Sequence, residues 1–269
     1  MNYRHLYHAG NFADVLKHGL LCWIVAYLQQ KEAPLAFIDT HAGRGVYDLS
    51  APEARKTGEA GQGIDRVLAA ENPPEPLAPY LSLVRRQGVG AYPGSPLLLA
   101  GLVRPQDRIT ACELHPQEAA ALRQATAASR QLRVLEVDGY ARLQGLVPPP
   151  EKRGLVLMDP PFEQPDELSA LAESFIAAHR KWPTGVFLLW FPVKDRARFA
   201  RFLDELRSAQ IPKLSLCEID VDRPQGLSAA GLLLANAPYT LKAEWAPTLA
   251  WLARTMAQGP NASSRFEDL

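Results

Sequence analysis

The chain has 269 residues, of which 47% are hydrophobic, and its 29 lysines and arginines balance its 29 aspartates and glutamates. This composition excludes a disordered chain, and the length suits one sizeable core or one domain with a substantial insertion. Because the net charge is zero, any binding of nucleic acid must depend on local cationic patches.

The cysteines and the first residues indicate a cytoplasmic protein. Cys22, Cys112 and Cys217 are far apart in apolar runs, so they offer neither a disulfide framework nor a CxxC metal site. Residues 1–5 lack the apolar stretch of a signal peptide, and no run approaches the roughly 18 consecutive apolar residues of a membrane span. We therefore expect a cytoplasmic chain without a membrane partner.

Short β-type runs alternate with longer helical patterns along the chain, which predicts a parallel sheet wrapped by helices. The predicted helices are 11–30, 116–129, 166–182 and 194–209, and the predicted strands are 35–39, 108–113, 132–137, 154–158, 185–191, 213–220 and 230–236. The linker between the last two strands is too short for a helix, so we expect this pair to be antiparallel.

About 70 residues separate the first two predicted strands, many more than one crossover helix needs. Residues 46–107 are therefore predicted to be an insertion with helical pieces at 58–70, 77–87 and 96–103. On this division, residues 1–45 hold the first helix and strand of the main domain, and residues 108–257 hold its remainder. The polar residues 258–269 are predicted to be a flexible tail.

A glycine-rich turn follows the first predicted strand, which ends at Asp39. Gly43 and Gly45 let the backbone turn tightly and approach a ligand closely. A dinucleotide site would want a third small residue at position 48, which is aspartate. This departure argues against NAD and favours the acidic-x-x-x-Gly-x-Gly form that binds S-adenosylmethionine.

The next predicted strands also end on carboxylates. Glu113 follows one strand, where a carboxylate can accept both ribose hydroxyls, and Asp138-Gly139 follows another, where an acid can accept from an adenine amino group. Each acid alone could be a helix cap or a solvated strand end. Together with Asp39 and Asp159, at one edge of a parallel sheet, they favour a cofactor site.

The apolar run 154–158 ends in Asp159-Pro160-Pro161-Phe162, which suggests methyl transfer to an exocyclic amino group. Such a nitrogen is a poor nucleophile because its lone pair is delocalised into the ring. The Asp159 carboxylate and the Pro160 carbonyl would accept its two N–H groups and hold it near a sulfonium methyl, in a turn that the prolines stiffen. Phe162 would offer a flat face for the base. The alternative is a strand followed by an inert proline-rich loop.

Residues 3–18 are dense in functional side chains, and Asp14, Lys17 and His18 share one face of the predicted helix. A zinc site with His5 and His8 is conceivable, but the spacing is not that of a zincin and no cysteine is near. A surface helix with ordinary charges is a second alternative. We favour a lid over cofactor and substrate in which Lys17 meets phosphate, and we expect no metal.

Five motifs of the chain are similar to those of the ribosomal RNA large subunit methyltransferase J family. They are Tyr-Arg-His-x-x-His-Ala-Gly-Asn-x-Ala-Asp-Val-Leu-Lys-His at 3–18, Asp-Thr-His-Ala-Gly-x-Gly at 39–45, Tyr-Pro-Gly-Ser-Pro at 92–96, Glu-Leu-His-Pro at 113–116 and Asp-Pro-Pro-Phe at 159–162. The resemblance covers nearly the whole chain. It implies an α/β, Rossmann-like S-adenosylmethionine-dependent methyltransferase sheet with a small helical insertion after the first strand. The implied reaction is methylation of N6 of one adenine in 23S ribosomal RNA.

The resemblance also implies roles for residues at matching motif positions. The implied catalytic residue is Asp159, and Tyr3 and Lys17 are at substrate-side positions. The implied cofactor positions are His18, His41, Ser95, Glu113, Asp138, Gly139 and Asp159. From the arguments on the residues themselves, we add Pro160 and Phe162 to the catalytic set, Gly43 to the cofactor set and the cation Arg4 to the RNA side. One departure is Phe162, where the familiar form has tyrosine: stacking survives, but a hydroxyl hydrogen bond is lost. The expected partner is 23S RNA that is protein-free or in early assembly, bound by a monomer.

Other functions stay open at this point. An N6-adenine DNA methyltransferase shares the chemistry, but such enzymes usually carry a sizeable target-recognition domain and only the insertion at 46–107 is available. A glutamine-side-chain methyltransferase resembles Asn-Pro-Pro-Tyr, and this chain has Asp159. A non-catalytic RNA-binding module would have little use for an intact Asp-Pro-Pro-Phe beside an intact cofactor set.

Overall fold

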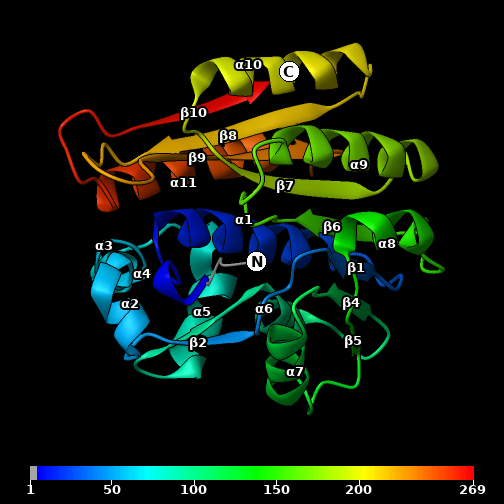
Figure 1. Cartoon of the computed structure of the whole chain (residues 1–269), viewed down its shortest axis with the longest axis horizontal. Helices are drawn as coiled ribbons and strands as arrows, with labels where there is room; N and C mark the ends of the chain where they lie inside the picture. Colours follow the sequence, from blue (N-terminus) through cyan, green and yellow to red (C-terminus); the bar gives the residue numbers. More distant parts are fainter. Residues whose placement is uncertain (1–4) are drawn as a thin grey trace.

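The central sheet has eight strands in the order β10-β8-β9-β7-β6-β1-β4-β5 in the computed structural model, which describes residues 5–269 (Figure 1). Its strands are β1 (Ala36–Asp39), β4 (Arg108–Cys112), β5 (Leu132–Leu135), β6 (Gly154–Met158), β7 (Val186–Pro192), β8 (Leu214–Asp220), β9 (Ala229–Ala235) and β10 (Ser263–Asp268). A separate antiparallel pair is made by β2 (Val46–Asp48) and β3 (Ala91–Pro93).

The sheet is parallel on one side and antiparallel on the other. β5, β4, β1, β6 and β7 run parallel, whereas β7/β9, β9/β8 and β8/β10 are antiparallel pairs. The predicted antiparallel ending is therefore confirmed. The strand order reverses between β1 and β6, and in open α/β sheets this switch point is where ligands bind.

Helices cover both faces of the sheet, so the α/β, Rossmann-like prediction is confirmed (Figure 1). The helices are η1 (His5–Tyr7), α1 (Phe12–Leu28), α2 (Pro52–Thr57), α3 (Glu59–Gln62), α4 (Ile64–Ala69), η2 (Glu75–Leu77), α5 (Ala78–Gln87), α6 (Ser95–Leu102), α7 (Pro116–Ala125), α8 (Gly139–Leu146), α9 (Glu167–Lys181), α10 (Arg196–Ser208) and α11 (Leu241–Thr255). None of the helices in residues 5–269 is long and apolar enough to cross a membrane.

The core has two main layers because strand side chains alternate between the faces. Leu155 and Leu157 of β6 pack with residues of α1, α6 and α11, whereas Val156 and Met158 pack with residues of α8, α9 and α10. The three cysteines, one each from α1, β4 and β8, are fully buried and are not bonded to one another.

The predicted helices in the main domain are confirmed to within a few residues, but the insertion is more broken than expected. The segment 58–70 forms two short helices, α3 and α4, which Gly63 separates. The sequence patterns did not individually predict α2, α8, α11 or the β2–β3 pair. The assignment of residues 46–107 to a subdomain of their own remains a prediction.

The flexible tail is a wrong prediction. Residues 263–268 form β10, which pairs antiparallel with β8 from Ser263 opposite Asp220 to Asp268 opposite Ser215. The segment is polar because an edge strand keeps much of its surface in water, so low hydrophobicity did not mean disorder.

Candidate functional site

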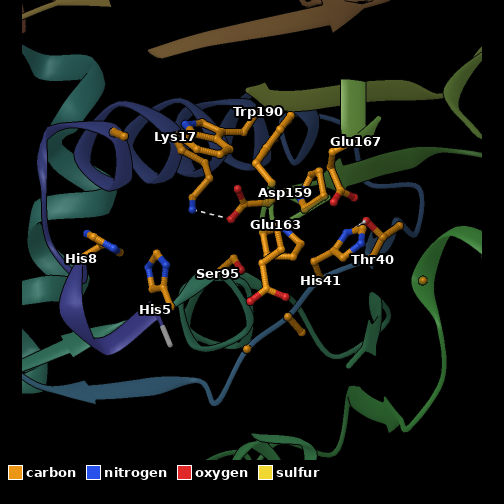
Figure 2. Close-up of a pocket in the computed structure, with 18 of the residues that line it drawn as sticks. His5, His8, Lys17, Thr40, His41, Ser95, Asp159, Glu163, Glu167 and Trp190 are labelled. Atoms are coloured by element: carbon orange, nitrogen blue, oxygen red, sulfur yellow. Dashed lines mark hydrogen bonds and ion pairs between the residues drawn. The ribbon is translucent and has the colours of Figure 1, made fainter. Parts of the chain in front are cut away.

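The carboxyl ends of β1, β4, β6 and β7 open into a cleft of about 1180 Å³, which the first turns of α1 also line (Figure 2). Loops that leave neighbouring parallel strands at one edge must converge, which is why the cleft forms there. It brings together every predicted site residue within residues 5–269: Lys17, His18, His41, Gly43, Ser95, Glu113, Asp138, Gly139, Asp159, Pro160 and Phe162. Tyr3 and Arg4 lie outside the described residues.

Asp159 starts the loop that leaves β6, and an aromatic pair lies beside it. The ring of Phe162 meets Trp190 of β7 edge-on, with centroids 5.5 Å apart. Phe162 has a φ of +51°, which is uncommon for a bulky residue and typically costs on the order of 1–3 kcal/mol. A conformation of this kind persists where the surroundings fix it, and in it the Phe162 ring lies against Trp190 at the cleft.

Lys17 holds Asp159 in place. Its ammonium donates to Asp159 Oδ2 at 2.5 Å (Figure 2). It also donates to Asp14 Oδ1 at 2.9 Å. Burial disfavours the charged form, but the two carboxylates outweigh it and raise the pKa of Lys17 above its usual range. Lys17 is only 3% exposed. The structure therefore places Lys17 inside an ion-pair network at the cleft, and the phosphate contact expected for it remains a prediction.

Asp14 anchors the other end of this network. Its Oδ2 accepts from the Gly10 amide at 3.0 Å and lies 2.8 Å from His5 Nε2. Burial would raise the pKa of Asp14, but the charges of His5 and Lys17 hold it well below the ordinary value. The network depends on the start of α1, where Asn11 Oδ1 accepts from the amides of Ala13 and Asp14 and caps the helix.

Glu113 holds together the turns after β1 and β4. Its two carboxylate oxygens accept from the amides of Gly43 and His115, each at 2.8 Å. Burial raises the pKa of Glu113 above its ordinary value, although the two hydrogen bonds act to lower it. A carboxylate has about four acceptor sites, so two remain for a ligand in the cleft.

Asp138 both faces the cleft and caps α8. Its Oδ1 accepts from the amides of Tyr140 at 2.9 Å and Ala141 at 3.3 Å, which leaves Oδ2 for a ligand. Gly139 is required by packing, because a Cβ there would overlap the Thr40 carbonyl oxygen. The helix-cap reading of Asp138 and a ligand role are thus compatible.

Asp39 is a buried acid behind the glycine-rich turn. It is 0% exposed, and it accepts from Ser95 Oγ at 2.6 Å and from the His41 amide at 3.2 Å. Burial raises the pKa of Asp39 to about 7 despite these hydrogen bonds. Ser95 is thereby fixed by Asp39, and the His41 ring lies edge-on to Tyr140 with centroids 4.7 Å apart.

Several site residues were missed at the sequence level. Trp190 is the sixth residue of a predicted strand next to the Asp159 loop, so its position gave a usable signal. Glu59 carried no signal in the sequence. Its carboxylate accepts from Asn11 at 3.1 Å and from Arg223 at 2.7 Å, and it lies 3.0 Å from His8 Nδ1. It thereby joins the start of α1 to α3 and to the β8–β9 loop, across separations of 48 and 164 residues.

The residues considered for zinc take part in these contacts instead. His5 pairs with Asp14, and His8 pairs with Glu59. Within residues 5–269 no group of three or more His, Cys, Asp or Glu side chains is arranged to hold a metal ion.

Comparison with known proteins gives consistent matches along the chain. A sequence model of the family described as "Ribosomal RNA large subunit methyltransferase D, RlmJ" matches residues 32–267. The chain is 36% identical over 260 residues to ribosomal RNA large subunit methyltransferase J of Escherichia coli K12, covering 94% of this chain and 92% of that protein. It is 36% identical over 265 residues to the Haemophilus influenzae protein of the same name, covering 95% and 94%. A crystal structure of a Legionella pneumophila protein matches with a TM-score of 0.90 at 35% identity, covering 97% of this chain and 98% of that chain.

Proposed function

Because the chain belongs to the ribosomal RNA large subunit methyltransferase J family, we propose that it moves a methyl group from S-adenosylmethionine to N6 of a specific adenine in 23S ribosomal RNA. The family expected from the five motifs is thereby confirmed. The observation that carries the finer proposal is the placement of Asp159, fixed by Lys17 and flanked by Phe162 and Trp190, at the edge of one large cleft.

The residues of the cleft fit this cofactor. Glu113 and Asp138 each keep acceptor capacity, suited to ribose hydroxyls and to an adenine amino group. Gly43, at a φ of +64°, lets the backbone come close to a ligand. When bound, S-adenosylmethionine supplies an electrophilic methyl group on a sulfonium.

The rest of the site positions the nucleophile. Lys17 occupies Asp159 Oδ2, so Oδ1 and the Pro160 carbonyl are left to accept the two N–H groups of an adenine amine. Accepting these hydrogen bonds turns the nitrogen lone pair toward the methyl group for direct, in-line transfer. Phe162 and Trp190 offer aromatic surface to the base, and a base already unstacked reaches the cleft at the lowest energy.

The proposed partner is 23S RNA, free of proteins or in early assembly, which places the reaction in the cytoplasm with the chain acting as a monomer. With a net charge of zero, we expect affinity for RNA to rest on a few local cations, and few phosphate contacts give a weak dependence on salt.

The test is transfer of tritium from labelled S-adenosylmethionine to ribosomal RNA, double-stranded DNA and protein, followed by mapping of N6-methyladenosine. We expect label in one adenine of protein-free 23S RNA, absent from that RNA when the protein is left out. Preferential labelling of DNA would make the chain an N6-adenine DNA methyltransferase, and labelling of a protein amide would equally refute the proposal.

A further inference from the structure

His18 lies at the end of a buried chain of hydroxyl groups that starts in the insertion. Its Nδ1 is 2.8 Å from the hydroxyl of Tyr92 in β3, which is 2.9 Å from the hydroxyl of Tyr80 in α5. All three side chains are at most 2% exposed. The insertion therefore contacts the cleft through a specific set of polar atoms.

The direction of these hydrogen bonds follows from the end of the chain. Within residues 5–269 the Tyr80 hydroxyl has Tyr92 as its only partner. If Tyr80 donates to Tyr92 and Tyr92 donates to His18 Nδ1, each hydroxyl proton is used. The reverse direction leaves the buried Tyr80 proton without an acceptor, which typically costs about 1–3 kcal/mol.

The protonation states of the three groups support this direction. Burial raises the pKa of both tyrosine hydroxyls well above the usual range, so both keep their protons. Burial, with the nearby charge of Lys17, holds the pKa of His18 well below its usual value, so the ring carries one proton. When Nδ1 accepts from Tyr92, that proton is on Nε2.

We propose that the Tyr92 hydroxyl fixes His18 as the Nε2–H tautomer, so that this N–H donates to a carboxylate of the ligand in the cleft. His18 lines the cleft, and its Nε2 makes no hydrogen bond within residues 5–269. The carboxylate is that of the methionine part of S-adenosylmethionine, an assignment that rests on the proposed function. The other tautomer would present an acceptor and would select an ammonium group instead.

The tautomer can be measured without any ligand. In the full chain labelled with ¹⁵N-histidine, the nitrogen shifts and two-bond couplings of His18, assigned with His18→Gln, report which nitrogen is protonated. We expect a protonated Nε2 and a hydrogen-bonded, unprotonated Nδ1. A protonated Nδ1 in the unmodified chain would overturn the inference.

Two variants then separate positioning from packing. Tyr92→Phe removes the donor to Nδ1, so the tautomers should mix and the Kd for S-adenosylhomocysteine, measured by calorimetry, should rise about fivefold. Tyr80→Phe is the control, because it removes a buried hydroxyl from the same chain but leaves Tyr92 to donate to His18. It should keep the tautomer and change the Kd less than about twofold.

The outcomes also separate this inference from the proposed function. A Kd that is equal in the two variants, or an unchanged tautomer in Tyr92→Phe, would refute the positioning role. An unmodified chain that does not bind S-adenosylhomocysteine would refute the ligand assignment together with the proposed function.

Discussion

Lys17 is the residue on which the position of the Asp159 carboxylate depends. Its ammonium is buried between the carboxylates of Asp14 and Asp159 and lies 5.9 Å from the centroid of the Trp190 ring. Removing one partner of a buried ion pair commonly costs about 3–5 kcal/mol, because the other charge is left without compensation. Among residues 5–269 Lys17 has two carboxylate partners, so loss of either aspartate leaves it one.

Replacing Asp159 with alanine should therefore abolish turnover while the fold survives. Loss of an aligned catalytic acceptor commonly lowers the rate by about 10² or more. Methyl transfer from labelled cofactor, beside a thermal unfolding curve, checks both halves. Asp204→Ala is the control, because that side chain is 72% exposed on α10. Near-normal transfer by a folded Asp159→Ala protein would remove Asp159 from the mechanism.

Asp39 should make the protein less stable as the pH rises from about 4 to 7. Its pKa in the folded chain is about 7 against an ordinary value of 3.8, so over this interval the native state binds more protons than the unfolded state. The free energy of unfolding then falls with pH, by about 4 kcal/mol at most at 1.36 kcal/mol per pKa unit.

Asp39→Asn should make the free energy of unfolding decrease less between about pH 4 and 7, as measured by urea unfolding at a series of pH values. Asp107→Asn is the control, because the contribution of Asp107 to stability should change with pH in the opposite direction to that of Asp39. Burial of Asp107 is outweighed by its hydrogen bonds with Arg104, which lower its pKa, so its stabilising contribution is lost as the pH falls. Equal pH slopes in Asp39→Asn and the unmodified chain would show that Asp39 is ionised throughout.

At the scale of elements, the start of α1 depends on the glycine between α3 and α4. The amide of Ile64 donates to the Gly10 carbonyl at 2.8 Å, and a Cβ at Gly63 would overlap that carbonyl oxygen. Gly10 in turn donates to Asp14. A side chain at position 63 would therefore displace Gly10, and with it the hydrogen bond to Asp14, which pairs with Lys17.

Gly63→Ala should lower both thermal stability and methyl transfer. Gly61→Ala is the matched control: it lies two residues earlier in α3, and nothing is within 4 Å of its Cβ position. Alanine there should be neutral or stabilising by about 0.5–1 kcal/mol, because it restricts the unfolded chain. Equal effects of the two substitutions would show that close packing on Gly10 is unimportant.

The sequence predicted the main sheet and its acidic strand ends because those features are local. α11 was missed because Pro247 interrupts its pattern, yet Trp245, Leu249 and Leu252 still form one buried face. The β2–β3 pair was missed because three-residue strands carry too little alternation to detect. The surroundings of Lys17 could not be predicted, since its contact with Asp159 spans 142 residues.

At the scale of the whole molecule, the cleft lies at the parallel part of the sheet. Gly43, Glu113 and Asp138, which we propose to contact the cofactor, follow β1, β4 and β5. Asp159 follows β6, and Trp190 lies in β7. The antiparallel strands β9, β8 and β10 extend the far end of the sheet, well away from β4 and β5 (Figure 1).

Deleting residues 258–269 should thus destabilise the protein without weakening cofactor binding. The deletion removes β10 and leaves β8 as an exposed edge strand, which favours aggregation. We expect the Tm to fall by about 5 °C or more and the Kd for S-adenosylhomocysteine to change less than about twofold. A large loss of affinity in a protein that stays folded would show that the two ends of the sheet are coupled.

The burial of all three cysteines makes their thiols reporters of local opening. A thiol reacts as the thiolate, and burial raises the pKa of Cys112 to about 12 and raises those of Cys22 and Cys217 further. Alkylation of the native chain should consequently be slow at each position and limited by transient exposure. Cys112 directly precedes Glu113, so S-adenosylhomocysteine should slow labelling of Cys112 more than that of Cys217, which peptide mass spectrometry can follow over time. Rapid, equal labelling at all three positions would contradict the buried placement.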